Sequence, residues 1–289
     1  MRSLRLLLVL GAAVLATACD SEGDITLAEH GPQASIRFVN AVNDSGPQDW
    51  RFVDAVEDSP TQFGLAYRGI FPGAGYLPVA AGSRHLRIFQ SWNPGDPTTA
   101  TPAIVTKVFF DTTFTFEEGA KYTIIAAGGL RSTATTRAKL YILKDNVPDP
   151  GSSIALRTVN VSADAASVDF YTAAPAGTAP SVSAVGFGTS SNYVTLGTAT
   201  SITATATAAG SKTSYASAAV PAGLPGDQLQ NLTPVGGTTQ AGSVITAFVF
   251  GAAVATTTPT FFSANPTNTA ALRSAAIVYA VDKHPPRGW

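Results

Sequence analysis

The feature that most constrains the fold of this chain is a succession of short β-rich runs separated by Gly, Pro, Asn and Asp. No convincing helical period occurs after residue 34. Leu86 and Ile88 alternate with His85 and Arg87, which is typical of a strand with one solvent-facing side. The 26 Gly and 19 Pro residues favour turns over helices. Short strands at this spacing predict an all-β protein built from antiparallel, immunoglobulin-like β-sandwiches.

The second half of the chain repeats the order of the first. Four segments match in sequence order: 37–40 with 157–160, 75–79 with 192–196, 119–123 with 242–246, and 140–145 with 277–282. Drift in the spacing is expected if loops changed length while strands stayed. Duplication is therefore favoured over chance matching. We expect a first sandwich at 35–146, a Pro- and Gly-containing linker at 147–152, a second sandwich at 153–283 and a tail at 284–289.

The N-terminus has the layout of a secretory signal. Arg2 and Arg5 precede an uncharged apolar run from Leu6 to Leu15, and small residues follow at 16–18. The run is too short for a standard transmembrane helix. The alternative is a buried N-terminal helix, which rarely begins at Met1 with this order of charges. Residues 1–18 are therefore predicted to be a signal peptide.

Residues 15–19, Leu-Ala-Thr-Ala-Cys, resemble the bacterial lipobox. The resemblance implies a diacylglycerol thioether on Cys19 and cleavage just before it. Ala16 stands where the family usually has Leu, so cleavage by ordinary signal peptidase is the alternative. The chain has one Cys, and it lies where lipid chemistry would use it. We expect an exported cell-envelope lipoprotein at the outer membrane or cell surface, held to a lipid bilayer through Cys19 and a flexible tether at 19–34.

Three segments resemble the DUF4397 domain, a bacterial module of unassigned function. They are Arg37–Val42, Gly75–Gly82 and Val168–Tyr171. The first half departs from the family pattern at Trp50–Asp54, where a Val-Asp-Val-Tyr strand is usual. The resemblance implies tandem modules in an exported or surface protein, and it supplies no catalytic residues.

Several classes of chemistry lack support in the sequence. A net charge of −1 argues against nucleic-acid binding, which needs a basic face. His30, His85 and His284 have no ligand-like spacing, so we expect no metal and no cofactor. Asn43 to Asp49 could offer oxygen ligands to calcium, but an ordinary Asx turn is the favoured interpretation.

The sequence also lacks a recognisable catalytic set. There is no Gly-x-Ser-x-Gly motif. Asp54, Glu57 and Asp58 form an acidic cluster that could serve a glycan-directed hydrolase, although clustered carboxylates in strand-rich proteins are usually solvated turn residues. We therefore predict that the protein is not an enzyme.

Aromatic residues near predicted turns are the candidate ligand-binding positions. They are Trp92, Trp50 and Phe71. Exposed rings on loops could stack on a sugar or a partner. The alternative is that each ring folds over the open end of its own sandwich.

These observations favour a non-catalytic surface binding or adhesion module whose partner is a glycan, a peptide or another envelope protein. An envelope hydrolase is one alternative. An architectural coat subunit is another, because the second half carries very few charged residues.

The lipid anchor can be tested by metabolic labelling. Palmitate should be incorporated into the wild-type chain and lost in Cys19→Ser, because the thioether needs the sulfur. Equal labelling of both chains, or none in wild type, would rule out the anchor.

Overall fold

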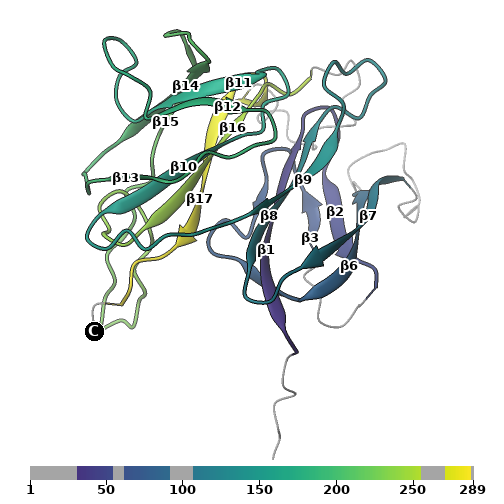
Figure 1. The fold of residues 1–289 in the computed structure, drawn as a ribbon, viewed down its shortest axis with the longest axis horizontal. Helices are drawn as coiled ribbons and strands as arrows, with labels where there is room; N and C mark the ends of the chain where they lie inside the picture. The colour runs from purple at the N-terminus through teal and green to yellow at the C-terminus, as the bar shows by residue number, and fades with distance from the viewer. Residues whose placement is uncertain (1–30, 55–61, 92–106, 255–270, 288–289) are drawn as a thin grey trace, which may run out of the picture. The chain divides into compact units, whose positions relative to one another are not determined.

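A computed structural model of the protein describes residues 31–54, 62–91, 107–254 and 271–287. Every named element in these ranges is a β-strand, so the all-β prediction is confirmed (Figure 1). The part described includes no helix long and apolar enough to cross a membrane. Residues Gln33–Trp289 form one compact unit. The predicted signal peptide and Cys19 lie outside the described residues.

The first sandwich consists of two sheets. One sheet has the order β4-β1-β8-β9, with β5 also paired to β1, and the other has the order β3-β2-β6-β7. The first sheet contains β1 (Gln33–Val42), β4 (Ile70–Phe71), β5 (Leu77–Ala80), β8 (Lys121–Gly128) and β9 (Lys139–Lys144). The second contains β2 (Gln48–Phe52), β3 (Gln62–Leu65), β6 (Gly82–Gln90) and β7 (Val108–Phe116).

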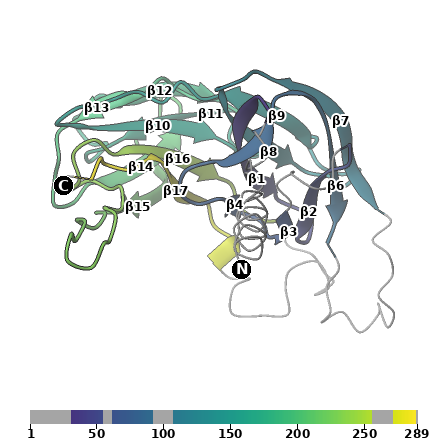
Figure 2. The same ribbon diagram turned by 90° about the horizontal axis from the view of Figure 1, so that it is seen from below.

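The second sandwich uses the same pairing pattern. Its sheets have the orders β13-β10-β16-β17 and β12-β11-β14-β15. The first contains β10 (Ile154–Asn160), β13 (Val194–Leu196), β16 (Val244–Phe250) and β17 (Ala276–Lys283). The second contains β11 (Ser167–Tyr171), β12 (Val182–Gly186), β14 (Thr203–Ala208) and β15 (Ser214–Ala219). A hairpin stands out after β15 (Figure 2). The predicted linker at 147–152 lies between β9 and β10.

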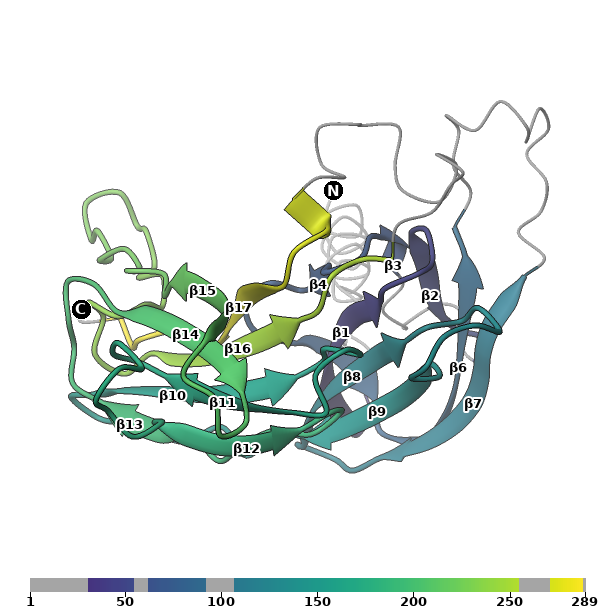
Figure 3. The same ribbon diagram turned by 90° about the horizontal axis from the view of Figure 1, so that it is seen from above.

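The sheets are not antiparallel throughout, in contrast to the prediction. β1 pairs with β8 in parallel, and β10 pairs with β16 in parallel (Figures 1 and 3). The cause is the crossing from one sheet to the other after β7. The short turn at residues 117–120 brings the chain back beside the start of β1, where the Gly119 amide donates to the Gln33 carbonyl at 2.7 Å. β8 therefore runs in the same direction as β1.

Each sandwich encloses an apolar core, and a third apolar cluster lies between the two sandwiches. Phe38, Trp50 and Ile124 belong to the first core, and Phe170 and Ile245 to the second. The third cluster joins residues of both halves: Val39, Ala41, Tyr67, Ile125, Ala127, Val159, Val161, Phe248, Phe250, Ala253 and Ala280. β8, β10 and β16 are consequently buried almost throughout. The sheets containing β1 and β10 therefore pack against each other as well as against their own partner sheets.

Two buried ion pairs cross between the sandwiches beside this cluster. Arg37 on β1 lies 2.6 Å from Asp282 on β17, and both side chains are fully buried. Arg157 on β10 lies 2.7 Å from Asp145, just after β9, and both are almost fully buried. The second contact is an ion pair without hydrogen-bond alignment. Each sandwich thus supplies an arginine to the carboxylate of the other.

Hydroxyl groups complete both carboxylate sites. Thr123 and Tyr76 donate to Asp145 at 2.5 and 2.9 Å. Thr246 and Tyr193 donate to Asp282 at 2.5 and 2.9 Å. These donors offset part of the cost of burying each carboxylate.

Burial, followed by the Asp282 charge, raises the pKa of both Tyr76 and Tyr193. Both phenols therefore remain protonated donors across the physiological range. Burial alone would lower the pKa of Arg157, but the neighbouring Asp145 carboxylate outweighs it and the pKa is raised. The Arg157 guanidinium therefore stays charged across the physiological range.

The crossed ion pairs can be tested with a double-mutant cycle in urea. Removing one partner, by Arg37→Met or Asp282→Asn, should lower the free energy of unfolding by roughly 3–5 kcal/mol, because the other charge stays buried and unpaired. The double variant should lose less than the sum of the two, by about 2 kcal/mol.

The exposed pair Lys144–Glu117, at 2.6 Å, is the matched control. Its cycle should yield under about 1 kcal/mol, since water screens both groups. Additive losses at Arg37 and Asp282 would contradict the assignment of a coupled pair.

Candidate binding pocket between the sandwiches

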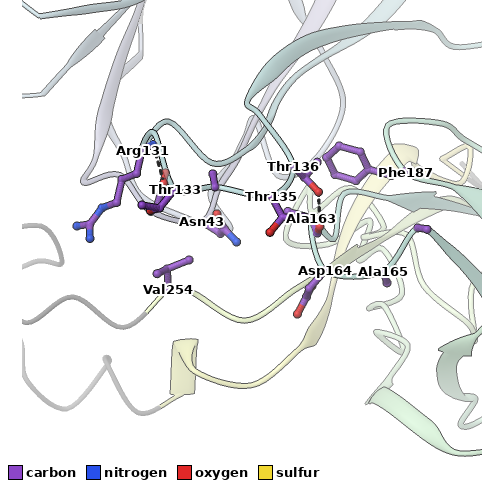
Figure 4. A pocket seen from close by; sticks show the side chains of 13 residues that line it. Asn43, Arg131, Thr133, Thr135, Thr136, Ala163, Asp164, Ala165, Phe187 and Val254 are labelled. Carbon is purple, nitrogen blue, oxygen red and sulfur yellow. Dashed lines mark hydrogen bonds between the residues drawn. The ribbon is translucent and has the colours of Figure 1, made fainter.

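A pocket of about 740 Å³ lies between the sandwiches, at the end of their contact that is away from the two ion pairs. Its walls are turns and loops that follow strands of both halves (Figure 4). Asn43, Asp44 and the loop around 131–136 come from the first sandwich. Residues 163–166, Phe187 and Val254 come from the second. The pocket therefore exists only where the two sandwiches meet.

The same asparagine turns the chain toward the pocket in each half. Asn40 accepts a hydrogen bond from the Val42 amide, and Asn160 accepts one from the Ser162 amide, both at 3.0 Å. The Asn40 side-chain amide donates to Leu65, and the Asn160 side-chain amide to Val185. Because both side chains are buried and fully engaged, the ends of β1 and β10 are held in place.

Asp44 shapes the wall that the first sandwich contributes. It is buried, and its two oxygens accept hydrogen bonds from the Leu130 and Arg131 amides at 2.7 and 2.9 Å. The carboxylate therefore holds the loop between β8 and β9. With both oxygens engaged by backbone donors, Asp44 has a positioning role in the pocket wall.

Asp164 occupies the equivalent place in the second sandwich. One of its oxygens, Oδ1, accepts hydrogen bonds from Ser162 and from Tyr215, the latter at 2.6 Å. Burial, followed by the hydrogen bond to Asp164, raises the pKa of Tyr215, which therefore stays a neutral donor. Oδ2 accepts no hydrogen bond from the described residues. It is the carboxylate oxygen at the pocket that a ligand could use.

Hydroxyl groups and one aromatic ring complete the lining. Thr136 donates to the Ala163 carbonyl at 2.7 Å and so ties the two walls together (Figure 4). Thr133 and Thr135 are exposed beside it. Phe187 is half-buried and packs edge-on against Tyr141, with ring centroids 5.6 Å apart. The pocket thus combines hydroxyls, one carboxylate oxygen, the Arg131 side chain and an aromatic ring.

The side chains that line the pocket decide which contacts a ligand could make there. The described lining contains no histidine and no cysteine. Ser162 donates to Asp164 without an imidazole between them, so the two groups do not form an activated nucleophile. No group of three His, Cys, Asp or Glu residues able to hold a metal occurs among the described residues. The groups present can hydrogen-bond and stack on a ligand.

The aromatic residues predicted from the sequence do not line this pocket. Trp50 is fully buried in the first core, with its ring centroid 5.1 Å from that of Phe38. Burial there leaves no ring face for an external ligand. Phe71 is half-buried on β4, opposite Phe38, and packs on the same core. Trp92 lies outside the described residues.

The acidic cluster considered for a hydrolase is described only at Asp54, since Glu57 and Asp58 lie outside the described residues. Asp54 Oδ2 lies 2.9 Å from Arg84 Nε. Burial raises the pKa of Asp54, but hydrogen bonds from Arg84 and from the backbone outweigh it, so the net shift is downward. A carboxyl with a lowered pKa is ionised at neutral pH, which does not suit a general acid.

The pocket residues carry a sequence signal beyond the four matched segments. The match between Arg37–Asn40 and Arg157–Asn160 extends to an aspartate four positions after each asparagine, at Asp44 and Asp164. These are the acidic residues of the two pocket walls. An internal alignment that is extended by four residues therefore identifies them.

Comparison with known proteins places part of the chain in a family. No curated protein matches the sequence. A model of the family "Domain of unknown function (DUF4397)" matches residues 34–171, a range that includes the first sandwich as well as β10 and β11. Residues 34–171 of this chain therefore contain a DUF4397 domain.

Proposed function

We propose that this protein is a non-catalytic binding protein of the bacterial cell envelope, and that it holds a neutral, hydroxyl-rich ligand such as a glycan in the pocket between its sandwiches. The observation that carries this proposal is the composition of the pocket. Threonine hydroxyls, Asp164 and the Phe187 ring converge there from two packed sandwiches. Sugars are bound by the same kinds of group, since they offer many hydroxyls and an apolar ring face.

Rigidity of the walls supports the same ligand class. Asp44 fixes one wall through two backbone amides, and Asn40 and Asn160 fix the turns. A preformed site loses little conformational entropy on binding, so a few hydrogen bonds can yield useful affinity.

We further propose that the second half is a second DUF4397 module. Support comes from the strand pairing, which is the same in both halves, including the parallel pair in the first sheet. Duplication also explains why equivalent residues, Asp44 and Asp164, stand on opposite walls of one pocket. Under this proposal the pocket is a product of the duplication, since neither module forms it alone.

Export and a lipid anchor at Cys19 belong to the same proposal. They rest on the charged, apolar and small-residue segments before Cys19 and on the position of the single cysteine. An anchored protein would present its pocket to ligands outside the cytoplasm.

Binding to a glycan array tests the proposed function. Wild type should bind at least one class of neutral glycan, and Asp164→Asn should weaken that binding about tenfold or more, because a charge-assisted hydrogen bond contributes roughly 1.5–3 kcal/mol.

Tyr215→Phe is the matched control, because it removes a donor to Asp164 but keeps the carboxylate at the pocket. Its affinity should stay close to that of wild type. Trp92→Ala on the same array tests the loop position predicted from the sequence. Absence of binding above background, or equal binding by wild type and Asp164→Asn, would contradict the pocket as a glycan site.

A further inference from the structure

The hairpin between β15 and β16 carries an apolar tip that the first sandwich lacks. Residues 220–243 separate these strands, whereas residues 117–120 make the corresponding connection from β7 to β8. Seven large hydrophobic side chains are exposed among the described residues, and four of them lie on this hairpin: Leu224, Leu229, Leu232 and Val235. Leu229 at the tip is 98% exposed. Concentration of exposed apolar groups on one projection indicates a contact surface.

The hairpin is well structured despite this exposure. Leu224 and Val235 exchange two backbone hydrogen bonds at 3.0 and 2.9 Å, and Asp227 and Leu232 exchange two more at 3.0 and 2.8 Å. Asp227 also accepts a hydrogen bond from the Leu229 amide at 2.8 Å, which closes the turn at the tip. The apolar side chains are therefore held outward by an ordered backbone.

The base of the hairpin is tied to the second sandwich. The Thr238 amide donates to Pro221, and the Ala199 amide donates to Thr238, both at 2.9 Å. A Cβ added to Gly237 would lie 2.0 Å from the Gly223 nitrogen, so the two arms approach as closely as their backbones allow. The tip consequently keeps a fixed direction relative to β16.

The hairpin and the beginning of β1 lie at the same end of the molecule. Arg37, in the first half of β1, contacts Asp282 near the end of β17, and the Gly242 amide at the hairpin base donates to Ser153, just before β10 (Figure 1). Gln33, the first residue of β1, therefore lies at the end from which the hairpin projects. A fully extended chain from Cys19 to Gln33 would reach at most about 50 Å.

The charges of the hairpin suit a lipid surface. Residues 221–242 contain one charged side chain, Asp227, and its carboxylate is engaged in the turn. Arg287 is exposed and lies beside the tip, with its guanidinium 3.5 Å from the Asn231 side-chain oxygen. Leucines next to a cation are typical of segments that dip into the headgroup region and pair with anionic lipid.

We propose that the hairpin tip inserts Leu229 and Leu232 into the surface of the bilayer that carries the lipid anchor, with Arg287 at the headgroups. The proposal rests on the proposed anchor at Cys19, which brings the hairpin within reach of the membrane. The tip then acts as a second, non-covalent contact. It sets the orientation of the sandwiches on the membrane.

A fluorescent probe at the tip tests this contact. The mature chain carries Cys19→Ser, and a hexahistidine tag in place of residues 1–18 tethers it to vesicles of phosphatidylethanolamine and phosphatidylglycerol with a nickel-chelating lipid. Leu229→Cys then provides a single thiol for an NBD label. The matched control is Ser132→Cys, on an exposed loop at the pocket end. Leu229 is almost fully exposed, so its substitution should not disturb folding.

The label at residue 229 should shift its emission to shorter wavelength on vesicles and lose most of its intensity to spin-labelled lipid. The label at residue 132 should do neither. Adding Leu232→Asp should abolish the shift at residue 229. If both labels report water while the chain is bound, the tip does not enter the bilayer and the inference is wrong. Because the tag replaces the acyl group, this result is independent of the palmitate test of the anchor and of the glycan test of the pocket.

Discussion

The crossed ion pairs between Arg37 and Asp282 and between Arg157 and Asp145 are the constraint on which the arrangement of the two sandwiches depends. An arginine that is buried in the middle of β1 needs an anionic partner, because an unpaired buried charge is very costly. Its partner lies on β17 of the other sandwich. The converse holds for Arg157. Neither half therefore pairs its own buried charges. Separating the sandwiches would leave two arginines and two carboxylates without their partners.

The apolar cluster between the sandwiches adds to this constraint. Phe248 and Phe250 on β16 belong to the same cluster as Val39 and Ala41 on β1. A strand that is buried on both faces needs apolar side chains at successive positions. β8 and β16 show this composition, whereas β7, at the edge of an outer sheet, alternates exposed and half-buried residues. The apolar contact between the sandwiches fixes the relative positions of the turns that line the pocket. The spacing of the two pocket walls therefore depends on it.

The strands that are easiest to predict from the sequence are β-rich apolar runs bounded by turn residues. The β-rich segments at 122–127 and 139–143 fall within β8 and β9. Tyr76 and Tyr193, which the matched segments 75–79 and 192–196 align, each donate to a buried carboxylate. β14, with the sequence Thr-Ala-Thr-Ala-Thr-Ala, has a weak strand signal because small residues give little hydrophobic contrast. β4 has a weak signal because it spans two residues.

Partner exchange between the halves could not be read from the sequence. Arg37 and Asp282 are distant in the chain, and each belongs to a strand that could have paired its charge within its own module. Trp50 is a second case. Its position near a predicted turn suggested a ring available to a ligand, but the ring is fully buried. Trp50 pairs with Ile88 on β6, and this register places the ring in the core. In both cases the outcome depends on which distant strands pair and in which register. The residues around a single position do not carry that information.

The pocket and the hairpin lie at opposite ends of β1. The proposed ligand site and the proposed membrane contact are therefore separated by the length of a strand. β1 begins at Gln33 on the hairpin side and ends at Val42 beside the pocket residues Asn43 and Asp44. A ten-residue strand spans about 33 Å. With the hairpin at the bilayer surface, the pocket opens roughly that far above it, directed away from the lipid. A ligand reaching the pocket would then come from the surroundings or from a neighbouring polymer rather than from the membrane. The crossed ion pairs lie on the hairpin side of the apolar cluster, so they also brace the end of the protein that the proposed anchor and hairpin contact would hold.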